Sequence, residues 1–390
     1  MDLKTAVVMQ WEDRPLRVWE IGEQGLLKRL QSFCPTELVG DDAAVLTVQS
    51  QRSLIVTSDV LVDGVHFSDR TTTPEDAGWR AAAANLSDLA AMGAMPLGIT
   101  VGLGVPAEVE VDWIERLYQG ITDCLQQYNT VIVGGDVCRS PVMTIAITAF
   151  GEADPTRIIR RSTAQPGDVL LMTGFHGASR AGLELLLHPE QGGALGPDDR
   201  AALIQAHQRP KPRLDVVPLL WRAQGSGQRL ETGNDRETRR EAVAEKLAER
   251  FSSQFTSQQI PGRIQNALPA YSIAGMDSSD GLADAIVQIC RASGVGARVE
   301  RHQIPLPSAL TGWVGTEQAL HWALYGGEDF ELVLCLPPQE AEDLLQQLQA
   351  GAAIVGRITS DPEIWLVDQS NNYPAQQLIL EQGFQHFANH

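Results

Sequence analysis

EDAGWRAAAANLSDLAAMG, residues 75–93, is the stretch of this sequence that most narrows the fold. Pro74 precedes it, Gly93 ends it, and alanine and leucine fill most positions between them. This pattern predicts one long helix. Asn85 and Asp88 are three residues apart, so they share one face of that helix.

Strands are expected on both sides of this helix. Apolar runs predict strands at 43–48 and 53–57 before it, and at about 97–103, 130–134 and 142–150 after it. A further helix is expected at 109–127. We therefore predict an α/β (α+β) domain with several antiparallel strand neighbours, covering residues 1–152.

A second domain is expected over residues 153–390. The turn Pro166-Gly167-Asp168 precedes an apolar strand, and helices are predicted at about 176–187, 198–208 and 214–222. Residues 224–262 are rich in Gln, Ser, Thr, Arg and Glu, and we interpret them as a polar insertion that contains one amphipathic helix. Folded chain resumes at 276–290, a loop that enters a helix.

Composition limits the classes of function. The 390 residues carry a formal net charge of −19, which repels nucleic-acid phosphates, and there is no basic block to offset it. No apolar run is long enough for a membrane span. The five cysteines are scattered without a CxxC pair, which argues against a disulfide framework or a zinc site and fits a reducing cytoplasm.

The common phosphate and hydrolase motifs are missing from the sequence. It has no GxxxxGK[ST], GxGxxG, HExxH or GxSxG pattern, so P-loop enzymes, dinucleotide-binding folds, metalloproteases and serine hydrolases are disfavoured. Lysine occurs only at positions 4, 28, 211 and 246. Phosphate chemistry here would depend on arginine, backbone amides or bound cations.

Acidic residues recur instead at predicted strand ends and turns. The six motifs are Gly40-Asp41-Asp42, Thr57-Ser58-Asp59, Asn85-Leu86-Ser87-Asp88, Gly134-Gly135-Asp136, Asp277-Ser278-Ser279-Asp280-Gly281 and Gly326-Gly327-Glu328-Asp329. Each one alone is better explained as an ordinary turn or helix cap than as a ligand. Together they predict carboxylates gathered at one sheet edge, where Mg²⁺ would offset their repulsion and bind phosphate oxygens.

Seven segments in this order resemble the thiamine-monophosphate kinase family: GDDAAVL, TSDVLVDGVHF, NLSDLAAMGAMPLG, IVGGDVCRS, RRSTAQPGD, DSSDGLADA and YGGEDFELV. The resemblance covers about 20–222 and 263–390. It places the chain in the larger group of enzymes like aminoimidazole ribonucleotide synthetase. It implies a two-domain fold whose N-terminal domain pairs with a second copy to form a β-barrel, with a C-terminal α/β domain beside it and ATP between them.

The resemblance also implies an activity and its site residues. The activity is transfer of the γ-phosphate of ATP to thiamine monophosphate, giving thiamine diphosphate, in a homodimer that uses several Mg²⁺ ions. The composition adds the expectations of a cytoplasmic protein that binds neither nucleic acid nor membrane. The implied magnesium ligands are Asp42, Thr57, Ser58, Asp59, Asp88, Asp136, Asp277 and Asp280. The implied nucleotide contacts are Tyr118, Gly135, Asp136, Arg161 and Ser279, and the implied thiamine-phosphate contacts are His66, Glu328 and Phe384.

Alternatives remain for the individual residues and for the whole chain. His66 could cap a strand end, Glu328 could be a turn residue, Phe384 could be core and Arg161 could be a solvated charge. The chain could also be another enzyme of the same superfamily, such as a selenophosphate synthetase, a purine-pathway synthetase or the hydrogenase-maturation dehydratase. A different class is a catalytically silent protein that binds nucleotide or metal for regulation. No dedicated catalytic base is expected, because the acceptor phosphate is already largely ionised near neutral pH.

Overall fold

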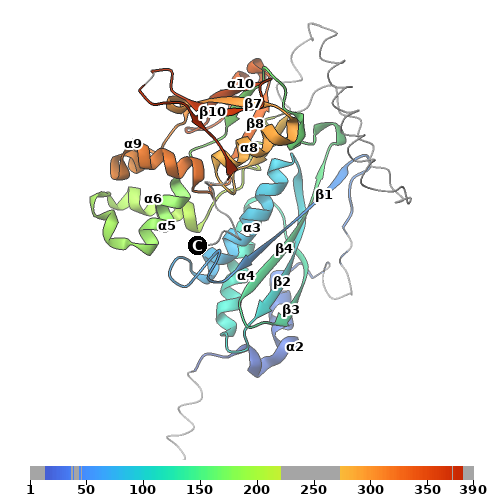
Figure 1. The fold of residues 1–390 in the computed structure, drawn as a ribbon. Helices are drawn as coiled ribbons and strands as arrows, with labels where there is room; N and C mark the ends of the chain where they lie inside the picture. Colours follow the sequence, from blue (N-terminus) through green and yellow to red (C-terminus); the bar gives the residue numbers. More distant parts are fainter. Residues whose placement is uncertain are drawn as a thin grey trace, which may run out of the picture.

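The structure is a computed structural model that describes residues 14–36, 38, 44, 46–220, 273–370 and 372–380. The predicted polar insertion, Asp42 and Phe384 lie outside these residues. Two sheets with packed helices make up the described fold (Figure 1). The first unit contains α2 (Val18–Leu30), β1 (Ser53–Val62), α3 (Pro74–Ala91), β2 (Met95–Val105), α4 (Val111–Gln127), β3 (Ile132–Arg139) and β4 (Thr144–Ala153).

The second unit follows. Its helices are α5 (Ala178–Leu187), α6 (Pro197–Gln208), α8 (Leu282–Ser293), α9 (Ser308–Tyr325) and α10 (Pro338–Leu345). Its strands are β5 (Val169–Met172), β6 (Ala274–Asp277), β7 (Gly296–Glu300), β8 (Leu332–Leu336), β9 (Ala353–Thr359), β10 (Ile364–Val367) and β11 (Gln376–Gln377). These seven strands form one mixed sheet in the order β11-β10-β7-β9-β5-β8-β6.

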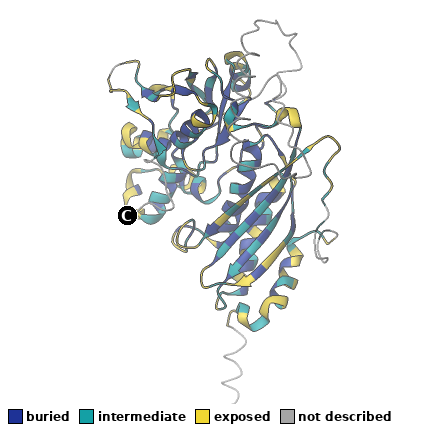
Figure 2. Cartoon of the chain, turned by 45° about the vertical axis from the view of Figure 1, so that its right-hand side comes forward, coloured by how far each residue is buried: buried dark blue, intermediate teal, exposed yellow. Residues whose placement is uncertain are grey.

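The first sheet has the order β1-β4-β2-β3. β4 pairs antiparallel with β1 and with β2, and β2 pairs parallel with β3. One face packs on α3 and α4. On the opposite face of β1, Leu54, Val56 and Val60 are 49%, 53% and 51% exposed. Figure 2 shows buried and intermediate residues alternating along strands of this sheet, as they do in β4.

The predicted helix at 75–93 is confirmed as α3, and it connects the two units. Thr73 and Asp76 form a capping box at its start, with Pro74 in the first turn. Nearly every side chain of α3 is buried, because the helix contacts β1 and β4 on one side and β6 and α6 on another (Figure 1). Its crossing with α4 is close enough to require glycine: a Cβ at Gly78 would lie 2.0 Å from the Leu117 carbonyl oxygen.

The hydrophobic core is continuous between the units. Leu332, Leu334 and Leu336 of β8 join the cluster that contains α3 and α4, whereas Val333 and Cys335 face a second cluster around α8. Alternation along one strand therefore places both faces of the second sheet in buried surroundings.

Three sequence-based predictions on secondary structure are wrong. Residues 214–220 form turns rather than the expected helix, and residues 44 and 46–48 of the expected strand at 43–48 are not in a strand. Thr57-Ser58-Asp59 and Gly134-Gly135-Asp136 do not end strands but lie inside β1 and β3. β1 continues because it pairs with β4 over its whole length, from Ser53 opposite Ala153 to Val62 opposite Thr144.

Candidate active site between the two units

Three buried or half-buried carboxylates gather where α3 meets β1 and β6. Thr57 on β1 donates a hydrogen bond from its hydroxyl to Asp88 on α3. Asp59 follows two residues later on the same face of β1, and its backbone N–H donates to Asn85 Oδ1 at 3.2 Å. Asp277, at the end of β6, accepts from the Ser87 hydroxyl at 2.7 Å.

These carboxylates oppose one another electrostatically. Burial, and then the charges of Asp88 and Asp280, raise the pKa of Asp59 to about 6. Burial, and then the charges of Asp88 and Asp59, raise the pKa of Asp277 to about 7, although the hydrogen bond from Ser87 works against this rise. The pKa of Asp88 is also raised by burial, against the lowering effects of Thr57 and Arg161. The cluster therefore favours binding of a cation.

The donor set is suitable for magnesium. It consists of carboxylate oxygens with a neighbouring hydroxyl, which are hard ligands. No three acidic, histidine or cysteine side chains of the described residues converge closely enough to hold a metal ion on their own. Mg²⁺ in phosphate-transfer sites needs only one or two carboxylates and takes its other ligands from phosphates and water, so the residues present fit such an ion.

Two predicted ligands are not brought to this cluster within one chain. Asp136 lies on β3, at the opposite edge of the sheet from Asp59 on β1. Three strand spacings separate the two edges, which is about 14 Å. The Ser58 hydroxyl lies on the other face of β1, where it donates to the Ile147 carbonyl at 2.9 Å.

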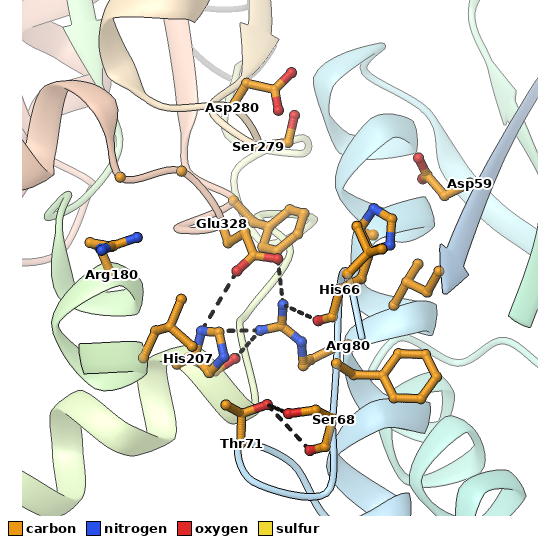
Figure 3. A pocket seen from close by; sticks show the side chains of 18 of the residues that line it. Asp59, His66, Ser68, Thr71, Arg80, Arg180, His207, Ser279, Asp280 and Glu328 are labelled. Carbon is orange, nitrogen blue, oxygen red and sulfur yellow. Dashed lines mark hydrogen bonds and ion pairs between the residues drawn. The ribbon is translucent and has the colours of Figure 1, made fainter. Parts of the chain in front are cut away.

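A cavity of about 610 Å³ opens beside the cluster, between the two units. Its volume is in the range of small-molecule sites. It is lined from the first unit by β1, the loop after it and α3, and from the second by α5, α6 and two loops, at 279–280 and 326–330. Asp59, Ser279 and Asp280 belong to this lining, so the cavity extends to the carboxylate cluster (Figure 3).

Glu328 and Arg80 meet across the cavity wall. Arg80 of α3 donates to the Glu328 carboxylate and to the His207 carbonyl, as Figure 3 shows. His207 Nδ1 lies 3.6 Å from Glu328, but burial, and then Arg80 and Arg180, lower the pKa of His207 to about 2. The histidine is therefore neutral, and the ion pair in this group is that of Arg80 with Glu328.

His66 caps a strand end and lies in the cavity wall, while its contact with thiamine phosphate stays a prediction. Its Nδ1 accepts a hydrogen bond at 3.1 Å from the backbone N–H of Val62, the last residue of β1, so it caps the strand end. It also lines the cavity. Because Nδ1 accepts, a neutral His66 carries its proton on Nε2.

The predicted nucleotide contacts are spread more widely. Arg161 donates to Gln288 on α8 at 2.6 Å, and its charge lowers the pKa of Asp88. Ser279 donates to Asp277 at 3.4 Å and lines the cavity. Tyr118 is instead buried on α4, 4% exposed, with its ring 5.6 Å from that of Phe33, and it does not line the cavity.

Gly135 has a structural reason to be glycine. A Cβ at this position would lie 2.2 Å from the Val101 carbonyl oxygen on β2. The pairing of β3 with β2 therefore excludes a side chain there, whether or not a nucleotide approaches. Contacts of Gly135 and Tyr118 with nucleotide stay predictions.

Sequence reasoning missed Arg80, His207, Arg180 and Phe330, all of which line the cavity. Arg80 offered one usable signal, because it is the only charged residue between Asp76 and Asp88 in an alanine-rich helix. Its partner Glu328 is 248 residues away. No local pattern could have paired the two residues.

Comparisons with known proteins give two family matches. Residues 40–153 match the family model described as AIR synthase related protein, N-terminal domain. Residues 269–368 match the AIR synthase related protein, C-terminal domain.

Individual relatives are more specific. The thiamine-monophosphate kinase of Synechococcus elongatus is 47% identical over 95% of this chain and 98% of its own. Among solved structures, thiamine-monophosphate kinase from Stenotrophomonas maltophilia superposes with a TM-score of 0.66 at 28% identity, covering 87% of this chain and 94% of its own. AaThiL complexed with AMPPCP and TMP superposes with a TM-score of 0.63 at 28% identity, covering 93% and 98%.

Proposed function

The chain belongs to the thiamine-monophosphate kinase family, and we propose that it transfers the γ-phosphate of ATP directly to thiamine monophosphate in the cavity between its two units. One observation carries this proposal: Asp59 and Asp280 belong both to the acidic surroundings of the cluster and to the cavity lining. A phosphate held at that junction would lie between a charge-neutralising site and an organic pocket. The relative AaThiL, complexed with AMPPCP and TMP, has the same fold.

The residues of the chain would act by positioning and by charge. The acceptor phosphate has a second pKa of about 6, so it is largely ionised near neutral pH. The proposed mechanism therefore includes no dedicated catalytic base. Asp59, Asp88, Asp277 and Asp280, with Asp42 outside the described residues, would hold Mg²⁺. When bound, magnesium supplies charge neutralisation on the phosphoryl oxygens.

Each end of the site would bind one of the two substrates. We assign thiamine monophosphate to the end lined by His66 and Glu328, with Phe384 as a further contact outside the described residues. We assign the nucleotide to the end with Arg161 and Ser279. Arg161 is the natural phosphate clamp because its guanidinium can donate two hydrogen bonds to one phosphate.

We also propose a homodimer that completes the site. β1 and β3 are the two edges of the first sheet in the described chain. Two-fold pairing of two such sheets would join β1 of one copy to β3 of the other and close an eight-stranded barrel over the exposed Leu54, Val56 and Val60. It would bring Asp136 of the second copy beside Asp59, which one chain alone does not do.

A cytoplasmic location is part of the proposal. All five cysteines lie in described residues, and all are free thiols, which suits a reducing compartment. Across the described residues, no helix has the length and apolar character needed to cross a membrane.

Phosphorus NMR of the purified protein with ATP, Mg²⁺ and thiamine monophosphate tests the function. We expect signals of thiamine diphosphate and ADP to grow together and to stop when EDTA is added. ADP and free phosphate without thiamine diphosphate would point to another acceptor. No consumption of ATP would instead support the regulatory alternative.

A further inference from the structure

Arg80 joins three segments of the cavity wall. It lies on α3 of the first unit and is 2% exposed. Besides the Glu328 carboxylate, its guanidinium donates to the backbone carbonyls of His207, on α6, and His66, in the loop after β1. A planar guanidinium with several donors can serve these acceptors at once, whereas a lysine ammonium cannot match that geometry.

Glu328 is held in a conformation that an L-amino acid seldom adopts. Its φ is +60°, and Gly327 before it has φ +69°. Such backbone persists only where the surroundings fix it. Two contacts do so: the Glu328 N–H donates to the Ser279 carbonyl at 2.7 Å, and the side chain accepts from Arg80.

The same pair decides what the cavity offers to a ligand. Glu328 has one carboxylate oxygen bound by Arg80, and its other oxygen faces neutral His207 at 3.6 Å. The Glu328 side chain is 34% exposed on the cavity side of the pair. An ionised carboxylate is acceptor-only, so it selects ligands that bring an N–H donor.

We propose that Arg80 is a positioning residue that fixes Glu328 as the acceptor for the amino group of the substrate's pyrimidine, and thereby makes the cavity select amino-substituted heteroaromatic phosphates. This inference rests on the proposed function. Arg80 itself does not touch the reacting phosphates. It acts through Glu328, so its effect belongs to substrate recognition rather than to phosphoryl transfer.

The chain offers a matched control on the same helix. Arg209, just after α6, pairs with Asp76 of α3 at 2.8 Å and lies over the Trp79 ring at 5.5 Å. This pair also joins α3 to the second unit, but neither residue lines the cavity. A merely structural role for Arg80 predicts that changes at Arg80 and at Arg209 have the same kinetic consequences.

The test compares R80K, R209K, E328Q and the double variant R80K/E328Q in steady-state kinetics, with circular dichroism to check folding. The substrates are ATP with thiamine monophosphate, or with oxythiamine monophosphate, which carries an oxygen in place of the amino group. We expect R80K to raise the KM for thiamine monophosphate about 10- to 100-fold, the range for loss of a hydrogen bond to a charged group, and to leave the KM for ATP within about twofold. R209K should leave both KM values unchanged.

The double variant isolates the link between the two residues. If Arg80 acts through Glu328, R80K in the E328Q background adds less than about twofold to the KM for thiamine monophosphate. Full additivity, or equal increases in both KM values, overturns the proposal. E328Q must also reduce the preference for thiamine monophosphate over oxythiamine monophosphate. If E328Q keeps that preference, the proposal about Arg80 and Glu328 fails, and this holds even when R80K does not fold. A wild-type protein that makes no thiamine diphosphate would instead refute the proposed function itself.

Discussion

Asp59 lies near the like charges of Asp88 and Asp280. This arrangement would attract a cation that binds phosphate, but the repulsion between the carboxylates lowers the free energy of unfolding. Burial together with Asp88 and Asp280 raises its pKa to about 6. Near pH 7 Asp59 is therefore mostly ionised in an environment that disfavours its charge. Stability and activity are therefore opposed at this residue.

Asp59→Asn should separate the two effects. We expect activity to fall by at least about 100-fold, because an amide removes the charge that attracts a cation. We expect the melting temperature of the protein without ligands to stay the same or rise, because repulsion in the cluster is relieved. The measurements are thiamine diphosphate formation and thermal unfolding. Asp168→Asn, at a buried turn that accepts from the Gln165 N–H at 2.9 Å, is the control and should keep its activity. A large loss of stability in Asp59→Asn with normal turnover would contradict this view of the cluster.

At this scale the sequence motifs predicted the gathering of Asp59, Asp88 and Asp277, because each aspartate occurs in a short segment of recognisable form. The placing of Asp59 and Asp88 depended on strand and helix periodicity, which local sequence carries. The Arg80–Glu328 pair depends on how α3 packs against a loop near the end of the chain. Contacts of that kind are set by tertiary packing, so they were missed.

Helix α5 forms one wall of the cavity, and its first turn is capped by a residue from a distant segment of the chain. Gly177, with φ +89°, precedes it, and no side chain of its own caps it. Asp329 supplies the missing acceptor: its carboxylate accepts from the Gly177 N–H at 2.7 Å and from the Ser179 N–H at 3.0 Å. The residue next to Glu328 thus ties the loop at 326–330 to α5.

Asp329→Ala should therefore lower the free energy of unfolding by about 1–2 kcal/mol, as loss of a helix cap does. Asp329→Asn keeps one acceptor and should cost less. The measurement is urea denaturation at constant pH. As a control, Asp154→Ala removes the exposed cap of a short 3₁₀ turn, where the carboxylate accepts from the Thr156 N–H, and should cost under about 0.5 kcal/mol. Equal losses in both alanine variants would show that the loop does not depend on this contact.

Element boundaries were predicted well where the signals were local. Pro74 and Gly93 delimited α3 to within two residues, and the strand expected at about 97–103 and the helix expected at 109–127 correspond to β2 and α4. The length of β1 was underestimated because Thr57-Ser58-Asp59 is polar, and polar residues usually mark the end of a strand. Here Thr57 and Asp59 face the carboxylate cluster while Ser58 bonds to β4. The polar segment therefore lies inside the sheet because of contacts that only the assembled structure reveals.

The acidic cluster makes the free energy of unfolding of the whole molecule depend on pH. The folded pKa values of Asp277 and Asp59, about 7 and about 6, lie above the ordinary value of 3.8. Protonation therefore favours the folded state. The stability these groups contribute is fully present below about pH 4 and is lost as pH rises through 6 and 7.

Below about pH 6.5 the lowered pKa values of buried His176 and His207 give an opposing trend, because these groups stabilise the fold more as pH rises. Thermal unfolding without ligands should therefore show a falling melting temperature between about pH 6.5 and pH 8, which corresponds to a loss of about 1 kcal/mol in the free energy of unfolding. Asp277→Asn should flatten the decline, and saturating Mg²⁺ with ATP should raise the curve most at the alkaline end, because the bound form stabilises the ionised carboxylates. A flat profile for the wild type, or the same slope in Asp277→Asn, would show that the cluster does not govern the pH dependence.

The distance between Asp59 and Asp136 makes the assembly testable by mixing variants. If Asp136 serves the site of the second copy, Asp59→Asn and Asp136→Asn chains each make inactive homodimers. A heterodimer of the two variants has one site with both substitutions and one site with neither. Random reassociation of equal amounts makes half the dimers heterodimers, so about a quarter of the wild-type activity should return.

Mixing Asp59→Asn with Asp88→Asn is the control. Both residues come from the same chain's cluster, so every heterodimer site carries one lesion and no activity should return. No recovery in either mixture would show that Asp136 acts within its own chain, which the order β1-β4-β2-β3 could allow only if the sheet itself were rearranged.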